Sequence, residues 1–169
     1  NNLKNIVNDK RLEGASTITQ QVAKNFLLTN EVSLKRKIKE AILAFRIEKA
    51  YSKERILELY LNQIYLGSGT YGIAAASLEY FDKSVKELNY SEAALLAALP
   101  KAPSKYNPFK YYEVAKLRRN LVLQNLNENN FISNEELKKF KSQEIYLKKR
   151  KIKLLQEANY YSEEIRRII

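Results

Sequence analysis

Glycine and proline, which interrupt regular helices, are scarce in this chain: four glycines and three prolines occur among 169 residues. Apolar residues recur at intervals of three and four positions, as on one face of a helix, and not at every second position. The pattern therefore predicts an all-helical protein. A hydrophobic content of 45% in a chain of this length is sufficient for one domain with a buried core.

The first predicted helices follow from apolar spacing and from residues that cap helix ends. One helix follows Gly14 and ends at a polar break in residues 29–31. The next is capped by Ser33, runs to about Ala50 and is expected to bury one apolar face. That face would consist of Leu34, Ile38, Ala41, Ile42 and Phe45.

Further helices are predicted along the rest of the chain. Ser52 can cap a helix that ends near the glycine-rich turn of residues 67–72, and a nearly all-apolar helix follows Ser91. Prolines between residues 100 and 108 mark a loop, after which helices are expected at residues 114–126 and after Ser133.

The composition restricts the chemistry. A net charge of +11 indicates an anionic partner, such as nucleic acid, an anionic membrane surface or a pyrophosphate-bearing substrate. The chain has no Cys or His, which excludes Cys–His and Ser–His–Asp nucleophiles and the usual zinc sites. No run of about 18 apolar residues occurs, so any membrane anchor is expected outside these residues. Because methionine is absent, we expect Asn1 to lie inside a longer or processed protein.

Polar residues form two stripes at helical spacing. Ser16, Gln20 and Lys24 recur at i, i+4 and i+8, and Arg36, Lys39 and Glu40 follow at i, i+3 and i+4 on the next helix. Two adjacent stripes of this kind can form a cleft for an anionic, hydrogen-bonding ligand. They can equally be two solvated helix faces, and spacing alone slightly favours the solvated faces.

Several short stretches resemble the signatures of a known family. Residues 14–21 read Gly-Ala-Ser-Thr-Ile-Thr-Gln-Gln and resemble the second signature of the family 51 peptidoglycan glycosyltransferases, the transglycosylase half of class A penicillin-binding proteins. Residues 36–40 resemble the third signature, Arg-Lys-x-x-Glu. Residues 56–67 with 71–76 resemble the fourth, and residues 118–123 resemble the fifth. With four signatures in order, the chain is identified as a member of this family.

The resemblance implies a fold and a domain division. Residues 1–127 are expected to form a lysozyme-like, all-α transglycosylase domain, and residues 128–169 a C-terminal helical extension towards a transpeptidase domain. The first family signature, Glu-Asp-x-x-Phe, carries the general base and is not found here, so it is expected before Asn1. The Ser-x-x-Lys and Lys-Thr-Gly motifs of the transpeptidase are also absent. We therefore expect these 169 residues alone not to polymerise substrate.

The resemblance also implies a reaction. The family joins lipid II units into glycan strands and releases polyprenyl diphosphate at the outer (periplasmic) face of the bacterial cytoplasmic membrane. The expected partners are lipid II, the growing lipid-linked strand, the membrane surface and other cell-wall synthesis proteins, with no nucleic acid. A divalent cation (Mg²⁺ or Mn²⁺) at the diphosphate is implied by the family, and its ligands in this chain are unknown.

Matching positions give the candidate site residues. Glu40 carries the family's second glutamate and is the expected catalytic residue. The expected substrate contacts are Ser16, Gln20, Lys24, Arg36, Lys39 and Arg119. For Arg119, an exposed basic helix face is an equal alternative. Related sequences often carry a basic residue where this chain has Val32, so a phosphate contact from that loop would be lost or moved.

Two alternatives to an active enzyme remain. One is a catalytically inactive fragment of such an enzyme. The other is a basic helical protein that binds nucleic acid, for which the charge and 12 tyrosines speak, although the tyrosines are scattered. Convergence of Lys24, Arg36 and Lys39 around Glu40 would exclude nucleic-acid binding.

Overall fold

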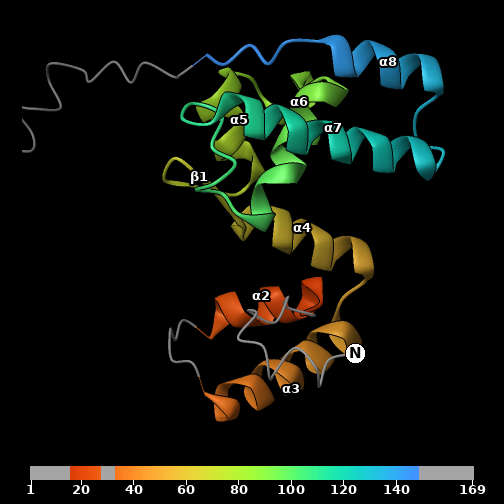
Figure 1. Ribbon diagram of the computed structural model, residues 1–169. Helices are drawn as coiled ribbons and strands as arrows, with labels where there is room; N and C mark the ends of the chain where they lie inside the picture. The colour runs from red at the N-terminus through yellow and green to blue at the C-terminus, as the bar shows by residue number, and fades with distance from the viewer. Residues whose placement is uncertain (1–15, 28–32, 149–169) are drawn as a thin grey trace, which may run out of the picture. The chain divides into compact units, whose positions relative to one another are not determined.

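The structure is a computed structural model that describes residues 16–27 and 33–148 (Figure 1). The described residues are mostly helical, which confirms the all-α prediction, and they belong to two compact units. The first unit contains the described residues up to Tyr65 together with Tyr71–Ile73, and the second contains Leu66–Thr70 and the described residues from Ala74 onward. The expected break at residues 29–31 and the residues after 148 lie outside the described part of the chain.

The described part of the first unit contains three helices: α2 (Ile18–Phe26), α3 (Leu34–Ala50) and α4 (Lys53–Gln63). The hydroxyls of Thr17, Ser33 and Ser52 cap them, each accepting a hydrogen bond from a backbone N–H three residues later. Helix α2 packs against both α3 and α4 (Figure 1). The core between them consists of Val22, Ala23, Ala44, Ile47 and Ile56.

The predicted buried face of α3 is wrong. Leu34 is 79% exposed and Ile38 55%, and Ala41, Ile42 and Phe45 are exposed as well. The residues of α3 that are buried are Glu40, Ala44 and Ile47. The apolar spacing correctly predicts a helix, but the apolar face of α3 turns away from α2 and α4. A contiguous apolar stripe on a surface marks contact with a partner or a membrane.

A short hairpin, which the sequence pattern did not predict as strands, follows α4. Strands β1 (Tyr65–Gly67) and β2 (Thr70–Tyr71) pair as a two-stranded sheet. Gly72 ends it with φ +81°, a conformation that disfavours side chains. A Cβ on Gly72 would lie 2.5 Å from the backbone oxygen of Asn62, so only glycine permits this close approach to α4.

The second unit contains the remaining described helices. These are α5 (Ile73–Phe81, whose first residue belongs to the first unit), the 3-10 turns η1 (Val85–Glu87) and η2 (Leu99–Lys101), α6 (Tyr90–Ala98), α7 (Tyr112–Glu128) and α8 (Asn134–Ser142). Helix α6 is largely buried, as its apolar composition predicts. Ser133 caps α8 in the predicted capping box. A core cluster of Ala94, Leu123, Ile132 and Phe140 joins α6, α7 and α8.

Candidate functional site

A buried carboxylate with two cationic partners is the central feature of the first unit. The side chain of Glu40 is 2% exposed. Its Oε1 lies 3.3 Å from Arg36 Nε, and its Oε2 lies 2.7 Å from Lys37 Nζ. Taking a carboxylate out of water is unfavourable unless opposite charges compensate it. Arg36 and Glu40, which are spaced i, i+4, thus form an ion pair within a larger cluster.

Lys37 extends this cluster to the segment before α2. Its Nζ donates to Glu40 and also lies 3.4 Å from Ser16 Oγ. Lys37 lies on another side of α3 than Arg36 and is not among the substrate contacts expected from the sequence. The distance of 2.7 Å between Lys37 Nζ and Glu40 Oε2 shows that the lysine next to Arg36 reaches the same carboxylate. Ser16, Arg36, Lys37 and Glu40 therefore form one connected group, called here the Glu40 cluster.

The predicted helical stripe of Ser16, Gln20 and Lys24 is only partly correct. Ser16 precedes the N-cap Thr17 and so lies outside α2. Gln20 closes a capping box: its backbone N–H donates to Thr17 Oγ1, and its Oε1 accepts from the Thr17 backbone N–H. Gln20 and Lys24 do share one side of α2, one turn apart.

Lys24 and Lys39 are exposed, and neither belongs to the Glu40 cluster. Lys24 lies in the last turn of α2, where a cation interacts favourably with the helix dipole. Of the three cations whose convergence on Glu40 would exclude nucleic-acid binding, only Arg36 lies at this carboxylate, and Lys37 joins it.

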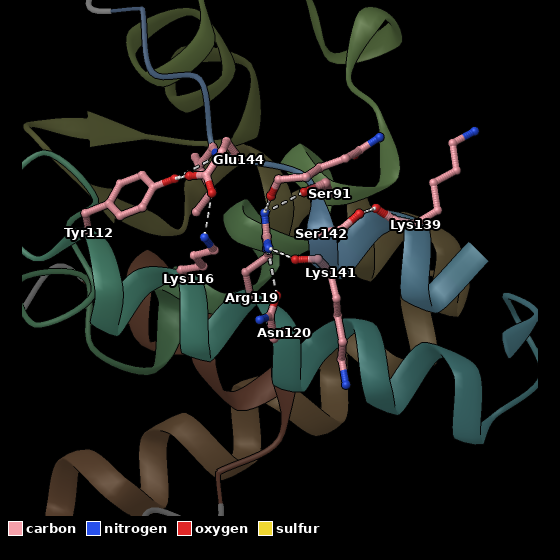
Figure 2. Close-up of polar contacts among 11 residues, drawn as sticks. Ser91, Tyr112, Lys116, Arg119, Asn120, Lys139, Lys141, Ser142 and Glu144 are labelled. Atoms are coloured by element: carbon pink, nitrogen blue, oxygen red, sulfur yellow. Dashed lines mark hydrogen bonds and ion pairs between the residues drawn. The ribbon is translucent and has the colours of Figure 1, made fainter. Parts of the chain in front are cut away.

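Arg119 on α7 is buried, so the alternative of an exposed basic face is wrong. Figure 2 shows its guanidinium surrounded by protein acceptors. Nη1 donates to Ser91 Oγ at 2.9 Å and to the Gln143 carbonyl at 2.7 Å; Nη2 donates to the Lys141 carbonyl at 3.1 Å and to Asn120 Oδ1 at 2.8 Å. Nε donates to Asn120 as well. All five N–H groups are therefore used within the protein.

A second group of contacts fastens the segment after α8 to α7 (Figure 2). Tyr112 donates its hydroxyl proton to Glu144 and accepts from the backbone N–H of Ile145, while Lys116 Nζ lies 2.8 Å from Glu144. Hydrogen bonds from Lys116 and Tyr112 lower the pKa of Glu144 below its usual value. Burial lowers the pKa of Arg119, against the opposing effect of Tyr112 and Glu144. These contacts hold the segment after α8 against α7, so their role is structural.

Arg118, which is not among the residues selected from the sequence, has fewer hydrogen bonds within the described residues than its neighbour Arg119. It is half-buried, and its guanidinium lies 5.7 Å from the ring centre of Tyr106. Within the described residues, its Nε has no hydrogen-bond partner. Helical periodicity could have separated the two arginines, because Arg119 shares the buried face of α7 with Ala115 and Leu123.

The described residues offer little for a metal ion or a membrane span. They contain no group of three or more acidic, His or Cys side chains placed to hold a metal. Both oxygens of Glu40 already face cations, so this carboxylate does not provide such a site alone. In the part of the chain that the structure describes, no helix has the length and apolar character needed to cross a bilayer.

Comparison with known proteins gives consistent matches. A transglycosylase family model matches residues 2–127. Penicillin-binding protein 1A of Rickettsia prowazekii (strain Madrid E) is 51% identical over 165 residues, which are 98% of this chain and 21% of that protein. Penicillin-binding protein 1A of Aquifex aeolicus (strain VF5) is 56% identical over 138 residues, 82% of this chain and 19% of that protein.

A solved structure shares the fold. The crystal structure of penicillin-binding protein 1A from Haemophilus influenzae matches with a TM-score of 0.55 and 34% identity, covering 92% of this chain and 20% of that one. This chain therefore spans about a fifth of the length of the curated relatives it matches.

Proposed function

Since this chain belongs to the transglycosylase family, with a lysozyme-like fold, we propose that it forms the donor-binding side of a peptidoglycan glycosyltransferase site. In the proposed reaction, a sugar hydroxyl of one lipid-linked glycan attacks the anomeric carbon of another and gives up its proton to a general base. The C–O bond to the diphosphate breaks with inversion, and polyprenyl diphosphate leaves. Negative charge grows on the leaving group, so preorganised cations lower the barrier.

The observation that carries this proposal is the buried Glu40 cluster. A carboxylate at 2% exposure with two cations contributes little net stability compared with an apolar packing of similar volume. The burial of this carboxylate among α2, α3 and α4 is better explained by a need to hold the two cations in place. We propose that Glu40 holds the cationic side chains of Arg36 and Lys37 in place beside the donor diphosphate.

The other predicted contacts take supporting roles in the proposal. The oxygen of Gln20 accepts in the helix cap, which leaves its NH₂ group to donate to a phosphate or sugar oxygen. Lys24 and Lys39 are exposed and add positive charge. Arg119 is left out, because its N–H groups are all committed within the protein.

A divalent cation does not enter the proposed steps. Its usual ligands are carboxylate oxygens together with substrate phosphates. The one carboxylate of the Glu40 cluster is paired with Arg36 and Lys37 on both oxygens. The described residues thus do not fit a metal held by the protein itself.

The exposed apolar stripe of α3 supports a membrane location. A lipid-linked substrate requires the site to lie close to a bilayer, and Leu34, Ile38, Ile42 and Phe45 expose apolar surface along one side of the helix. We propose that this stripe, called here the α3 stripe, rests on the outer face of the bacterial cytoplasmic membrane. A nucleic-acid partner is disfavoured, because Arg36 and Lys37 face an internal carboxylate instead of an outer surface.

Binding of undecaprenyl diphosphate in detergent micelles tests the donor site. Replacing Arg36 or Lys37 by Met removes a charge-assisted contact, and we expect affinity to fall about 10- to 100-fold. Arg46→Met is the matched control, since Arg46 is an exposed cation of the same helix. Equal affinity of all three variants would contradict the proposal.

A further inference from the structure

The segment that follows α8 crosses the second unit as an extended chain. Residues 143–148 form neither a helix nor a strand, and Gln143 begins the segment with φ −67° and ψ 132°, which lie in the β region. Figure 1 shows the segment as an open blue trace that continues from α8. It is called here the strap.

One edge of the strap is bound to α7. The carbonyl of Gln143 accepts from Arg119 Nη1 at 2.7 Å, and the N–H of Ile145 donates to the Tyr112 hydroxyl at 3.0 Å. Figure 2 shows Arg119 and Tyr112 reaching the strap from α7. In an extended chain, the backbone polar groups of residues two positions apart point to the same side. The edge formed by Gln143 and Ile145 is therefore occupied.

The opposite edge of the strap is free. By the same alternation, the backbone N–H and C=O groups of Glu144 and Tyr146 point away from α7. Within residues 16–27 and 33–148, these four groups have no hydrogen-bond partner. The free edge ends at Lys148, whose N–H donates to the Tyr80 carbonyl at 2.9 Å. An extended segment that is fixed on one side and free on the other is a template for pairing with a further strand.

A hollow of about 360 Å³ lies beside the strap, within the size range of ligand pockets. It is lined by residues 142–146 and, from the start of α6, by Asn89, Ser91 and Glu92. The lining contains the carboxylates of Glu92 and Glu144 and no cationic side chain, in a chain whose net charge is +11. The hollow therefore favours a positively charged group.

The hollow also contains an unused acceptor. Gln143 Oε1 is buried and has no hydrogen-bond partner among the described residues. Buried polar atoms are normally satisfied, so this oxygen requires a donor. An ammonium or a guanidinium supplies several donors together with positive charge. The ring of Tyr146, which is 80% exposed, offers such a cation an aromatic face.

We propose that the strap is a docking edge for an extended segment of a partner protein that carries a basic residue. The partner strand pairs with the backbone of Glu144 and Tyr146. Its Lys or Arg side chain enters the hollow, where it donates to Gln143 Oε1 and neutralises the two carboxylates. The strap belongs to the second unit and the Glu40 cluster to the first, so this surface serves assembly and not the transfer reaction.

Fluorescence anisotropy of a labelled peptide, Thr-Val-Thr-Lys-Val-Thr-Thr, with the 169-residue chain tests the docking edge. Tyr146→Pro removes one N–H of the free edge, and the φ of proline is compatible with an extended chain. The matched variant Tyr146→Ala also loses the ring but keeps the N–H. We expect Tyr146→Pro to bind about tenfold more weakly than Tyr146→Ala, and a peptide with Glu in place of its lysine to bind the parent about tenfold more weakly.

Two N-methylated peptides give an independent test with the unaltered protein. One carries methyl groups on the even-numbered backbone nitrogens and the other on the odd-numbered ones. Only one of these sets faces the strap in a β pair, so one peptide should bind as the unmethylated peptide does and the other at least about tenfold more weakly. If Tyr146→Pro fails to fold, as judged by its circular dichroism, the two methylated peptides decide.

Several results would overturn the inference. These are no binding of the peptide by the parent, equal binding by folded Tyr146→Pro and Tyr146→Ala, and equal binding of the two methylated peptides. A tenfold rise in peptide affinity on replacing Lys149, Arg150 and Lys151 by Ser would assign the edge to the chain's own basic residues and would also overturn a partner as its occupant. Tyr146→Pro should bind undecaprenyl diphosphate as the parent does, so the test is independent of the proposed function.

Discussion

Replacement of Arg119 by Met separates a structural role from a substrate-binding role. The substitution keeps an apolar chain of similar length and removes the guanidinium that joins α6, α7 and the end of α8. It leaves the Gln143 and Lys141 carbonyls, Ser91 Oγ and Asn120 Oδ1 without their donor. An acceptor that remains buried without a partner loses stability beyond the lost bond itself.

The size of the effect follows from these contacts. Leaving one buried acceptor without its donor costs about 1–3 kcal/mol, and four acceptors lose Arg119, so with partial relaxation we expect a loss of about 3–5 kcal/mol. In a protein of this size, 1 kcal/mol corresponds to about 2–4 °C in Tm, so the expected fall is about 6–20 °C. Arg119→Lys keeps the charge but not the planar fork of donors, and we expect it to be destabilised as well.

Thermal and urea denaturation followed by circular dichroism measure this loss. Arg118→Met is the matched control, because the neighbouring arginine is half-buried and stacks on Tyr106, an interaction of about 0.5–1 kcal/mol. The reasoning is refuted if Arg119→Met is as stable as the parent. A stable Arg119→Met variant that also loses affinity for undecaprenyl diphosphate would instead assign Arg119 to substrate binding.

Two further predictions concern the membrane surface and the segment after α8. Ile38 and Ile42 are 55% and 52% exposed, so the double variant Ile38→Ser with Ile42→Ser should partition to lipid vesicles about 10- to 100-fold more weakly than the parent. The matched control, Leu117→Ser with Leu121→Ser, removes two exposed leucines from α7 and should partition as the parent does. Equal partitioning of the two double variants would contradict the role of the α3 stripe. Because the pKa of Glu144 is lowered in the folded state, its contribution to stability is present at neutral pH and lost as the pH falls from about 4.5 through the folded pKa. In denaturation experiments across this range, the free energy of unfolding of Glu144→Gln should fall less with decreasing pH than that of the parent. An equal fall in both proteins would contradict this prediction.

Local features were predictable where short-range chemistry determines them. The caps at Ser33, Ser52 and Ser133 follow from a hydroxyl that accepts from a backbone N–H three residues later. The ion pair of Arg36 with Glu40 follows from i, i+4 spacing. Each of these depends only on neighbours within one helix turn.

Other features depended on tertiary packing. The helical period of α3 predicts the correct element but the wrong buried face, because periodicity alone does not determine whether the apolar side of a helix turns inward. Glu40 and Ile47 face the core instead, and a membrane surface would compensate the exposed apolar side. The burial of Arg119 and the link from Lys37 to Ser16 join residues far apart in sequence, which spacing alone does not reveal.

Glycan polymerisation by a Glu40→Gln variant tests the central claim most directly. The assay uses a chimera in which this chain replaces the matching 165-residue stretch of the Rickettsia prowazekii protein, with lipid II as substrate. Glu48→Gln, an exposed glutamate of the same helix, is the control. The account predicts that Glu40→Gln is destabilised by about 3–5 kcal/mol, because Arg36 loses its buried counter-charge, yet remains folded below its Tm and there loses at least about 100-fold in rate. Polymerisation at the rate of the parent chimera would contradict the role of the Glu40 cluster.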